Sequence, residues 1–285
     1  NGIDFWIVTH GWQNNSFYSY LLSSAGLSAT PVTSNVGTVV NGTTDFNWGY
    51  MKISPDGSRL AICNTRQNCQ LFDFNNATGV VSNPLTIINA EWSYGIEFSP
   101  NSKVLYVSVT YSNTDIYQFD LTASNIVASA QVFNVNVANA LQLAPNGKIY
   151  MAEAWHPSLG VINNPNIIGV GCGIQPNAVD LLGRNCKLGL PPFISTFFYT
   201  APVINLSSYC ENQTINFSFS TNQSIVNVLW DFGDGATSNL ISPNHVYTNA
   251  GNYNVTTVIT TPNNSINISK SITIFPKPTL LTNTT

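Results

Sequence analysis

A turn sequence built on proline recurs three times at a fixed interval, and it restricts the chain to a repeat fold. Pro55, Pro100 and Pro145 lie 45 residues apart, in the stretches KISPDGSRLAI, IEFSPNSKVLY and LQLAPNGKIYM. Proline sets φ at such a turn, and the Asp, Asn or Gly nearby tolerates the positive φ that follows. Each stretch therefore predicts two apolar strands joined by a tight turn.

Two further strands follow each turn. Third strands are predicted in CQLFDF and TDIYQFDL, where Phe72 and Tyr117 are again 45 residues apart, and fourth strands in GVVSNPLTI and NIVASAQVF. Four short strands in a period of about 40 to 50 residues are the signature of a β-propeller blade. An earlier stretch, DFWIVTHGWQNNSFYSYLL, matches only the second and third strands. We therefore expect about four blades in residues 1–199, the first without its opening strand, and an incomplete ring that would need residues upstream of Asn1.

The pattern changes near Thr200. About seven short alternating strands follow within some 80 residues, which is typical of an immunoglobulin-like sandwich. The sequence thus predicts an all-β chain with propeller blades in residues 1–199, a sandwich in residues 200–278 and a linker to a further module in residues 279–285.

The composition excludes some classes of partner. Only 8% of the residues are charged and the net charge is −4, whereas DNA binding and anionic membranes require clustered Lys and Arg. No apolar run reaches the roughly 20 residues of a membrane span. We expect no nucleic-acid partner and no direct membrane insertion.

Two resemblances to known families follow from these motifs. The SPDG-type repeat resembles the YVTN-like or lactonase-type propeller. The run Trp230-Asp231-Phe232-Gly233-Asp234-Gly235, followed by His245-Val246-Tyr247, resembles the PKD domain. That resemblance implies structural roles for Trp230, Asp231, Asp234, His245 and Tyr247, and a spacer or interaction module on a cell surface.

The segment GLPPFISTFF, at 189–198, resembles large secreted proteins of gliding Bacteroidetes. In those proteins a propeller precedes PKD modules and a signal for type IX secretion. The resemblance implies a secreted or surface-attached protein, whose partners are a surface protein, a glycan or components of a secretion or gliding complex.

The five cysteines fit an oxidising compartment outside the cell. Cys63 and Cys69 lie six residues apart across a predicted hairpin, and Cys172 and Cys186 bracket a loop. We expect a disulfide in each pair, with Cys210 left over. The alternative is that some of them are buried free thiols.

Propeller geometry predicts a binding face. The loops between blades and the loops between second and third strands lie at the same end of the blades. Trp, Tyr and Arg are enriched at binding hot spots. The residues placed there are Trp12, Trp48, Trp92, Trp155, Tyr111, Arg66, His10 and His156. The alternative for each tryptophan is packing between blades.

Signals of catalysis are weak. Asp231-Phe232-Gly233 lacks the phosphate loop and catalytic loop of a kinase, and its acidic spacing differs from a calcium loop, so we interpret it as a turn. We expect no cofactor, with calcium a minor alternative. Glu91, Glu97 and Glu153 are the candidates for a channel metal, but they are not equivalent in the repeat. The sequence favours a non-enzymatic adhesion protein; the alternatives are a lactonase-like or lyase-type enzyme and a structural subunit of a surface or secretion complex.

Overall fold

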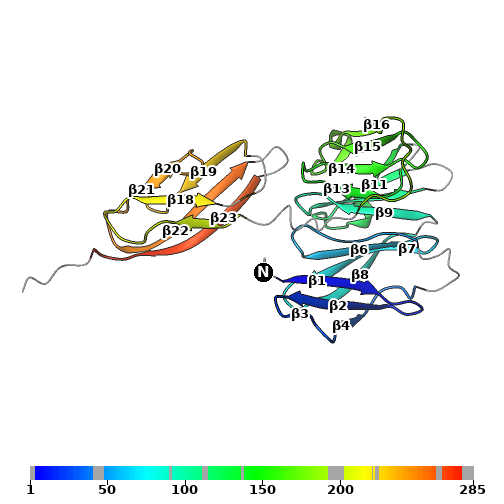
Figure 1. The fold of residues 1–285 in the computed structure, drawn as a ribbon, viewed down its shortest axis with the longest axis horizontal. Helices are drawn as coiled ribbons and strands as arrows, with labels where there is room; N and C mark the ends of the chain where they lie inside the picture. Colours follow the sequence, from blue (N-terminus) through cyan, green and yellow to red (C-terminus); the bar gives the residue numbers. More distant parts are fainter. Residues whose placement is uncertain are drawn as a thin grey trace, which may run out of the picture. The chain divides into compact units, whose positions relative to one another are not determined.

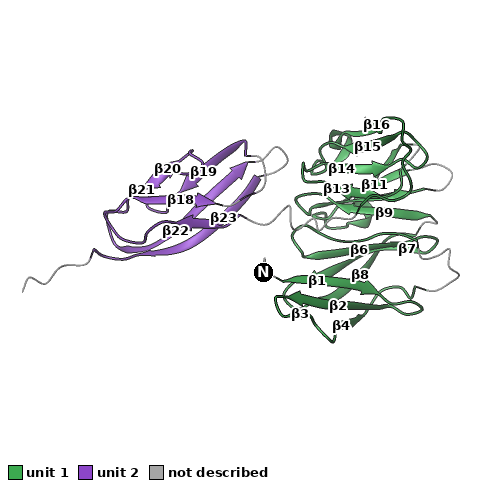
Figure 2. Ribbon diagram, in the orientation of Figure 1, with its two compact units in different colours: residues 1–199 green, residues 200–285 purple. Residues whose placement is uncertain are grey.

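The structure is a computed structural model that describes residues 4–40, 48–89, 92–110, 115–135, 138–191, 202–219, 221, 225–260 and 265–277. These residues form two compact units, 1–199 and 200–285 (Figure 2). The boundary falls where the sequence pattern changes. Each unit is built almost entirely of β-strands (Figure 1).

Unit 1 contains four antiparallel sheets of four strands, which are the β-propeller blades. Blade 1 holds β1 (Phe5–His10), β2 (Ser16–Ser23), β3 (Gly26–Leu27) and β4 (Val32–Asn35). Blade 2 holds β5 (Met51–Ile53), β6 (Arg59–Asn64), β7 (Asn68–Asn75) and β8 (Val80–Ile88). Blade 3 holds β9 (Ser93–Phe98), β10 (Val104–Val109), β11 (Asp115–Asp120) and β12 (Gln131–Asn134). Blade 4 holds β13 (Leu141–Leu143), β14 (Ile149–Ala152), β15 (Ser158–Ile162) and β16 (Ile174–Asp180).

Blades 2 to 4 are regular meanders, in which each strand pairs with the next along the chain. Blade 1 differs, because β3 and β4 both pair with β2 and β1 lies at the edge of the described sheet. Short 3-10 helices, η2 (Val127–Ser129) and η3 (Gly169–Cys172), interrupt the last connections of blades 3 and 4. The first strand of each regular blade lies against its neighbours, as β9 contacts both β6 and β13.

Apolar side chains from facing blades fill the space between them. Leu71 and Cys69 of blade 2 share a core with Ile96 and Leu105 of blade 3. The strands of these blades are therefore buried on both faces, which explains their nearly continuous apolar sequence.

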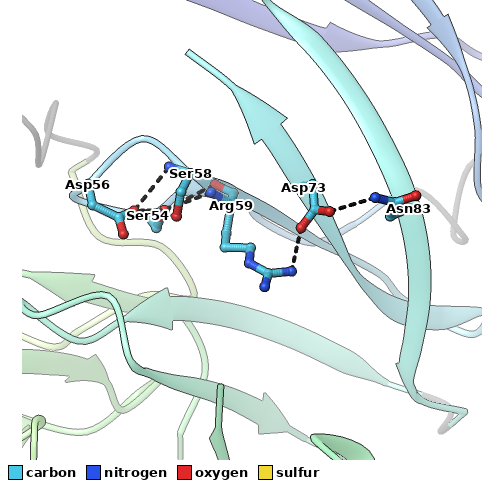
Figure 3. A network of polar contacts seen from close by, with 6 residues as sticks. All are labelled: Ser54, Asp56, Ser58, Arg59, Asp73 and Asn83. Carbon is cyan, nitrogen blue, oxygen red and sulfur yellow. Dashed lines mark hydrogen bonds and ion pairs between the residues drawn. The ribbon is translucent and has the colours of Figure 1, made fainter. Parts of the chain in front are cut away.

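The proline turns repeat a single hydrogen-bonding scheme. In blade 3, the Ser99 hydroxyl donates to Asn101 Oδ1 and accepts the Val104 N–H at 2.9 Å. In blade 2, the Ser54 hydroxyl donates to Asp56 Oδ1 and accepts the Arg59 N–H at 2.9 Å (Figure 3). The positive φ falls at one repeat position in all three turns, on Gly57, Ser102 and Gly147.

Unit 2 is a sandwich of two antiparallel sheets. One contains β17 (Ile204–Leu206), β18 (Ile215–Phe219) and β21 (Asn244–His245). The other has the order β20 (Thr237–Ser238), β19 (Asn227–Asp231), β22 (Gly251–Thr260) and β23 (Ser265–Ile274). Trp230 is 0% exposed at the centre of the core between them.

The two aspartates of the β19–β20 connection act as turn residues, as predicted. Asp231 Oδ1 accepts the Gly233 N–H at 2.9 Å, and Asp234 Oδ1 accepts the Ala236 N–H at 3.0 Å. The other Asp234 oxygen lies 2.7 Å from His245 Nε2. The Tyr247 hydroxyl donates to the Phe232 carbonyl oxygen at 2.9 Å, and burial is the largest cause that raises the pKa of Tyr247.

The cysteines correct one expectation. Cys63 and Cys69 are directly opposed on β6 and β7 and form a disulfide. The predicted second disulfide was wrong: Cys172 and Cys186 are both free and buried, and they belong to different clusters of the core. Burial raises the pKa of the Cys172 thiol. Sequence spacing alone could not distinguish two packed thiols from a bridged pair.

Candidate binding rim

The loops between blades and the hairpins between second and third strands lie at the end of the blades opposite the proline turns. We call this end, with Trp12, Trp48, Trp92 and Trp155, the tryptophan rim. Both the N–H and the hydroxyl of Thr65, in the β6–β7 hairpin, donate to the carbonyl oxygen of Trp48, between blades 1 and 2. Thr110 donates in the same way to the carbonyl oxygen of Trp92. These bonds attach each hairpin to the loop before its own blade, as the predicted geometry requires.

Three of the predicted tryptophans are exposed on this rim. Trp12 is 45% exposed, Trp48 51% and Trp155 67%. His156 is also exposed, whereas Trp92, Arg66 and His10 are half-buried. Tyr111 lies outside the described residues. Solvent access to three large indole rings makes them available to a partner.

The His10 side chain is half-buried and packs against Phe17. Its ring meets Phe17 edge to face, with centroids 4.5 Å apart, and Nδ1 lies 2.8 Å from the Gly11 carbonyl oxygen. Desolvation by burial lowers the pKa of His10. This histidine supports the β1–β2 hairpin below Trp12.

Two cations lie over indole rings of the rim. The Arg66 guanidinium carbon is 4.3 Å from the ring centroid of Trp92, and Lys187 Nζ is 3.5 Å from that of Trp155. Stacking of a cation on tryptophan stabilises each pair by about 0.5–1 kcal/mol at an exposed site. In each pair the cation covers one face of the indole, so a positive charge lies directly against the ring.

Four non-glycine residues of the rim have a left-handed backbone. They are Gln13 (φ 59°), Arg66 (φ 63°), Trp92 (φ 71°) and Trp155 (φ 69°). A bulky side chain in this region is a genuine outlier. Such strain costs of order 1–3 kcal/mol and clusters at functional sites. Sequence reasoning had no signal for it, because the usual markers of positive φ are glycine and asparagine.

The blade 4 end of the rim is held by backbone pairing. The Trp155 N–H donates to the Cys186 carbonyl oxygen at 2.9 Å, and the Cys186 N–H donates to the His156 carbonyl oxygen at 2.8 Å. Below them, the buried Glu153 carboxylate accepts the Ser158 hydroxyl and the Asn177 N–H. The buried Cys186 therefore attaches the segment that contains Lys187 to Trp155 and His156.

A polar row crosses the inner strands, and the sequence analysis missed it. Lys52, Glu97 and Gln142 are spaced by 45 residues, on β5, β9 and β13. Lys52 Nζ lies 3.0 Å from Glu97 Oε2 and 2.7 Å from Gln142 Oε1. Glu97 also accepts the N–H groups of Phe98 and Leu143. Lys52, Glu97 and Gln142 occupy equivalent positions of the repeat but differ in residue type, so a search for repeated acidic residues does not find this row.

Two of the three candidate metal ligands are thus engaged by other groups. Glu97 pairs with Lys52, Glu153 accepts hydrogen bonds in blade 4, and Glu91 lies outside the described residues. Within the described part of the chain, no three His, Cys, Asp or Glu residues gather closely enough to hold a metal ion. A hollow of about 460 Å³ lies at the proline-turn end of blade 2, beside Asp56 and Asp73. Arg59 and Asn83 bind the Asp73 carboxylate there (Figure 3).

Comparison with protein families decides the nature of unit 2. Residues 199–275 match the model of the PKD domain. Unit 2 is a PKD domain. The PKD1 domain of the Vibrio cholerae metalloprotease PrtV is 32% identical over 26% of this chain and 96% of that chain, with a TM-score of 0.23. The PKD1 domain of Vibrio anguillarum Epp is 23% identical over 27% of this chain and 98% of that chain, with a TM-score of 0.24.

A solved structure similar to a larger part of the chain is a putative 6-phosphogluconolactonase from Bacteroides uniformis. It is 12% identical over 85% of this chain and 68% of that chain, with a TM-score of 0.44. No curated protein matches the chain. In the residues that the structure describes, no helix is long and apolar enough to cross a membrane. The PKD domain and the Cys63–Cys69 disulfide together point to an extracellular protein.

Proposed function

We propose that the protein is a non-enzymatic binding protein of the cell exterior, secreted or attached to a surface. The tryptophan rim holds a surface protein or glycan, and the PKD domain acts as a spacer. The observation that carries the proposal is Trp155, whose side chain is 67% exposed on a left-handed backbone (φ 69°).

The strain argues against a purely structural role for Trp155. A left-handed backbone suits glycine without steric cost, and a side chain that is 67% exposed contributes little burial in return. Residues that oppose stability in this way are expected where binding is selected. Buried aromatics in this chain, such as Phe72 and Phe98, show the opposite arrangement, with 1% and 0% exposure.

The surroundings of the rim fit recognition of a partner. Indole rings supply a large rigid contact area at low entropic cost, and Arg66 and Lys187 place charges beside two of them. The resemblance of residues 189–198 to secreted proteins of gliding Bacteroidetes supports an extension of the proposal: export by type IX secretion and adhesion on a bacterial surface.

Replacement of Trp155 by glycine tests the proposal. We expect Trp155→Gly to fold with unchanged or higher thermal stability, since the left-handed backbone is relieved. Binding to intact bacterial cells and to immobilised glycans should fall at least ~10-fold, the loss of a typical hot spot. Asn212→Gly is the matched control, because Asn212 is also left-handed (φ 58°) and exposed but lies in the PKD domain.

The control should keep full binding. If Trp155→Gly, Trp48→Ala and Trp12→Ala all fold and bind cells and glycans like the parent protein, the rim is not the binding surface and the proposal fails.

A further inference from the structure

We propose that the blade 4 end of the tryptophan rim binds carboxylated sugars, such as uronic acids, within a surface polysaccharide. This inference rests on the proposed function and names the ligand class of the same rim. The residues that carry it are Trp155, His156, Arg184 and Lys187, with the buried Cys186 as their anchor.

Trp155 supplies the platform. Its indole is 67% exposed, and its backbone is fixed by the hydrogen bond to Cys186. An indole face stacks on the apolar C–H face of a pyranose ring and tolerates many sugars. Shape and stacking alone would therefore not select among glycans, so selection has to come from the groups around the ring.

Lys187 and Arg184 supply the selection. Lys187 Nζ lies 3.5 Å from the Trp155 ring centroid, and both cations belong to one exposed segment. Among the described residues the ion pairs are Lys52–Glu97, Arg59–Asp73 and His245–Asp234, and neither Lys187 nor Arg184 belongs to one of them. A sugar carboxylate beside the stacked ring would complete this pairing.

The two carboxylates of this end of blade 4 both accept hydrogen bonds, and Glu153 is buried. Asp180 Oδ1 accepts the Leu182 N–H at 2.9 Å, and Glu153 is 1% exposed with its oxygens bound to Ser158 and Asn177. His156 is exposed next to Trp155 and offers a hydrogen-bonding group to sugar hydroxyls. The cluster thus combines an aromatic platform with the Lys187 charge on it and an adjacent imidazole, and Arg184 lies three residues before Lys187 in the same exposed segment.

A second pair on the same rim favours a polymer over a single sugar. Arg66 lies over the Trp92 ring at 4.3 Å, again with an aromatic face beside a cation. The two pairs belong to different blades, so one extended acidic chain could contact both. Repeated weak contacts along a polymer raise the overall affinity without any new contact chemistry.

The decisive experiment compares two polymers that differ only in charge. Binding of the whole protein to polygalacturonate and to its fully methyl-esterified form is measured by biolayer interferometry. We expect the acid form to bind at least ~10-fold more tightly, because a hydrogen bond to a charged group is stronger than one to a neutral ester.

Two variants locate the effect. Lys187→Gln should weaken binding of the acid polymer ~10-fold and leave the ester unchanged, whereas Trp155→Ala should weaken binding of both. Lys103→Gln is the matched control, because it removes the same charge from the proline-turn end and should change neither.

The outcomes separate the two proposals. Equal binding of both polymers, or binding of cells without binding of polygalacturonate, overturns the acidic-sugar inference but leaves the rim as a binding surface. Retention of cell and polymer binding by the folded rim variants overturns the proposed function itself.

Discussion

The two ends of the same blades are built by different rules. At the proline-turn end, Ser54 and Ser99 make the same hydrogen bonds in successive blades, and the left-handed position falls at the same place in each repeat. At the tryptophan rim, the hairpins differ in length and in residue type, and left-handed backbone occurs on Gln13, Arg66 and Trp155. At the proline turns the left-handed position recurs in register and falls on glycine in two of the three turns, whereas at the rim the left-handed positions fall on larger side chains.

This difference teaches where to look for function in a repeat protein. A position that satisfies buried polar groups in every blade reports on stability. A position that breaks the repeat, exposes an aromatic ring and strains its backbone reports on binding. Substitutions at repeated positions should therefore destabilise, and relief of strain at the rim should stabilise.

The largest effect is expected at the inner strands. Glu97→Ala would leave Lys52 buried without its partner and two backbone N–H groups without an acceptor. Removal of one member of a buried pair destabilises by about 3–5 kcal/mol. Urea titration would measure the loss of unfolding free energy. Hydrogen exchange of peptides from β9 and β10 would show whether the loss is located in these strands.

The double variant Lys52→Met with Glu97→Leu serves as the comparison. It should recover much of that stability, because apolar residues can replace a buried ion pair. A loss below about 1 kcal/mol for Glu97→Ala would show that repeat-spaced positions do not carry stability here.

The second effect concerns the repeated serine of the proline turns. Ser99 is 0% exposed, and Ser99→Ala would leave the Val104 N–H without its acceptor. We expect a loss of about 2 kcal/mol, as for a buried donor left unsatisfied. Ala144 occupies the same position in blade 4, so Ala144→Ser should be tolerated. Thermal unfolding measures both variants. Equal changes in melting temperature for Ser99→Ala and Ala144→Ser would show that the repeated serine does not stabilise its turn.

Much of the fold was predictable from the sequence. The 45-residue spacing of the prolines located the strands of blades 2 to 4, and the WDFGDG run with its downstream histidine identified the PKD domain. These features are local, since a turn needs its own proline and its own left-handed residue. The alternation of strand direction predicted that Trp12, Trp48 and Trp155 lie in loops at one end of the blades. It did not predict their exposure, because packing between blades was the alternative for each of them.

What could not be predicted depends on side chains far apart in sequence. The Lys52–Glu97 pair joins residues of different type in two blades, so no motif marks it. Cys172 and Cys186 had plausible spacing for a disulfide, yet they pack into separate clusters. Trp155 combines a left-handed backbone with a hydrogen bond from its N–H to Cys186, 31 residues away, which a linear pattern does not show.

A methyl group added at the regular end tests the role of its glycine. Gly57 has φ 71°, and a Cβ there would lie 3.2 Å from the side chain of Asn76. The Asn76 side chain can yield, so the main penalty of Gly57→Ala is the left-handed backbone of an L-residue, about 1 kcal/mol. Thermal unfolding would measure it. An unchanged melting temperature would mean that the turn adopts another conformation without cost.

The smallest effect has the opposite sign and comes from the rim. Gln13 has φ 59° and an exposed side chain, and only its backbone N–H is needed, for the bond to the Val40 carbonyl oxygen at 2.9 Å. Gln13→Gly removes the strain and keeps that bond, but glycine also gains freedom in the unfolded chain. We therefore expect a net gain of only about 0.5 kcal/mol, measured as a higher urea midpoint with binding to cells retained. A loss of stability would show that the left-handed hairpin is supported by the side chain itself, and the contrast between the two ends of the blades would then rest on Arg66, Trp92 and Trp155.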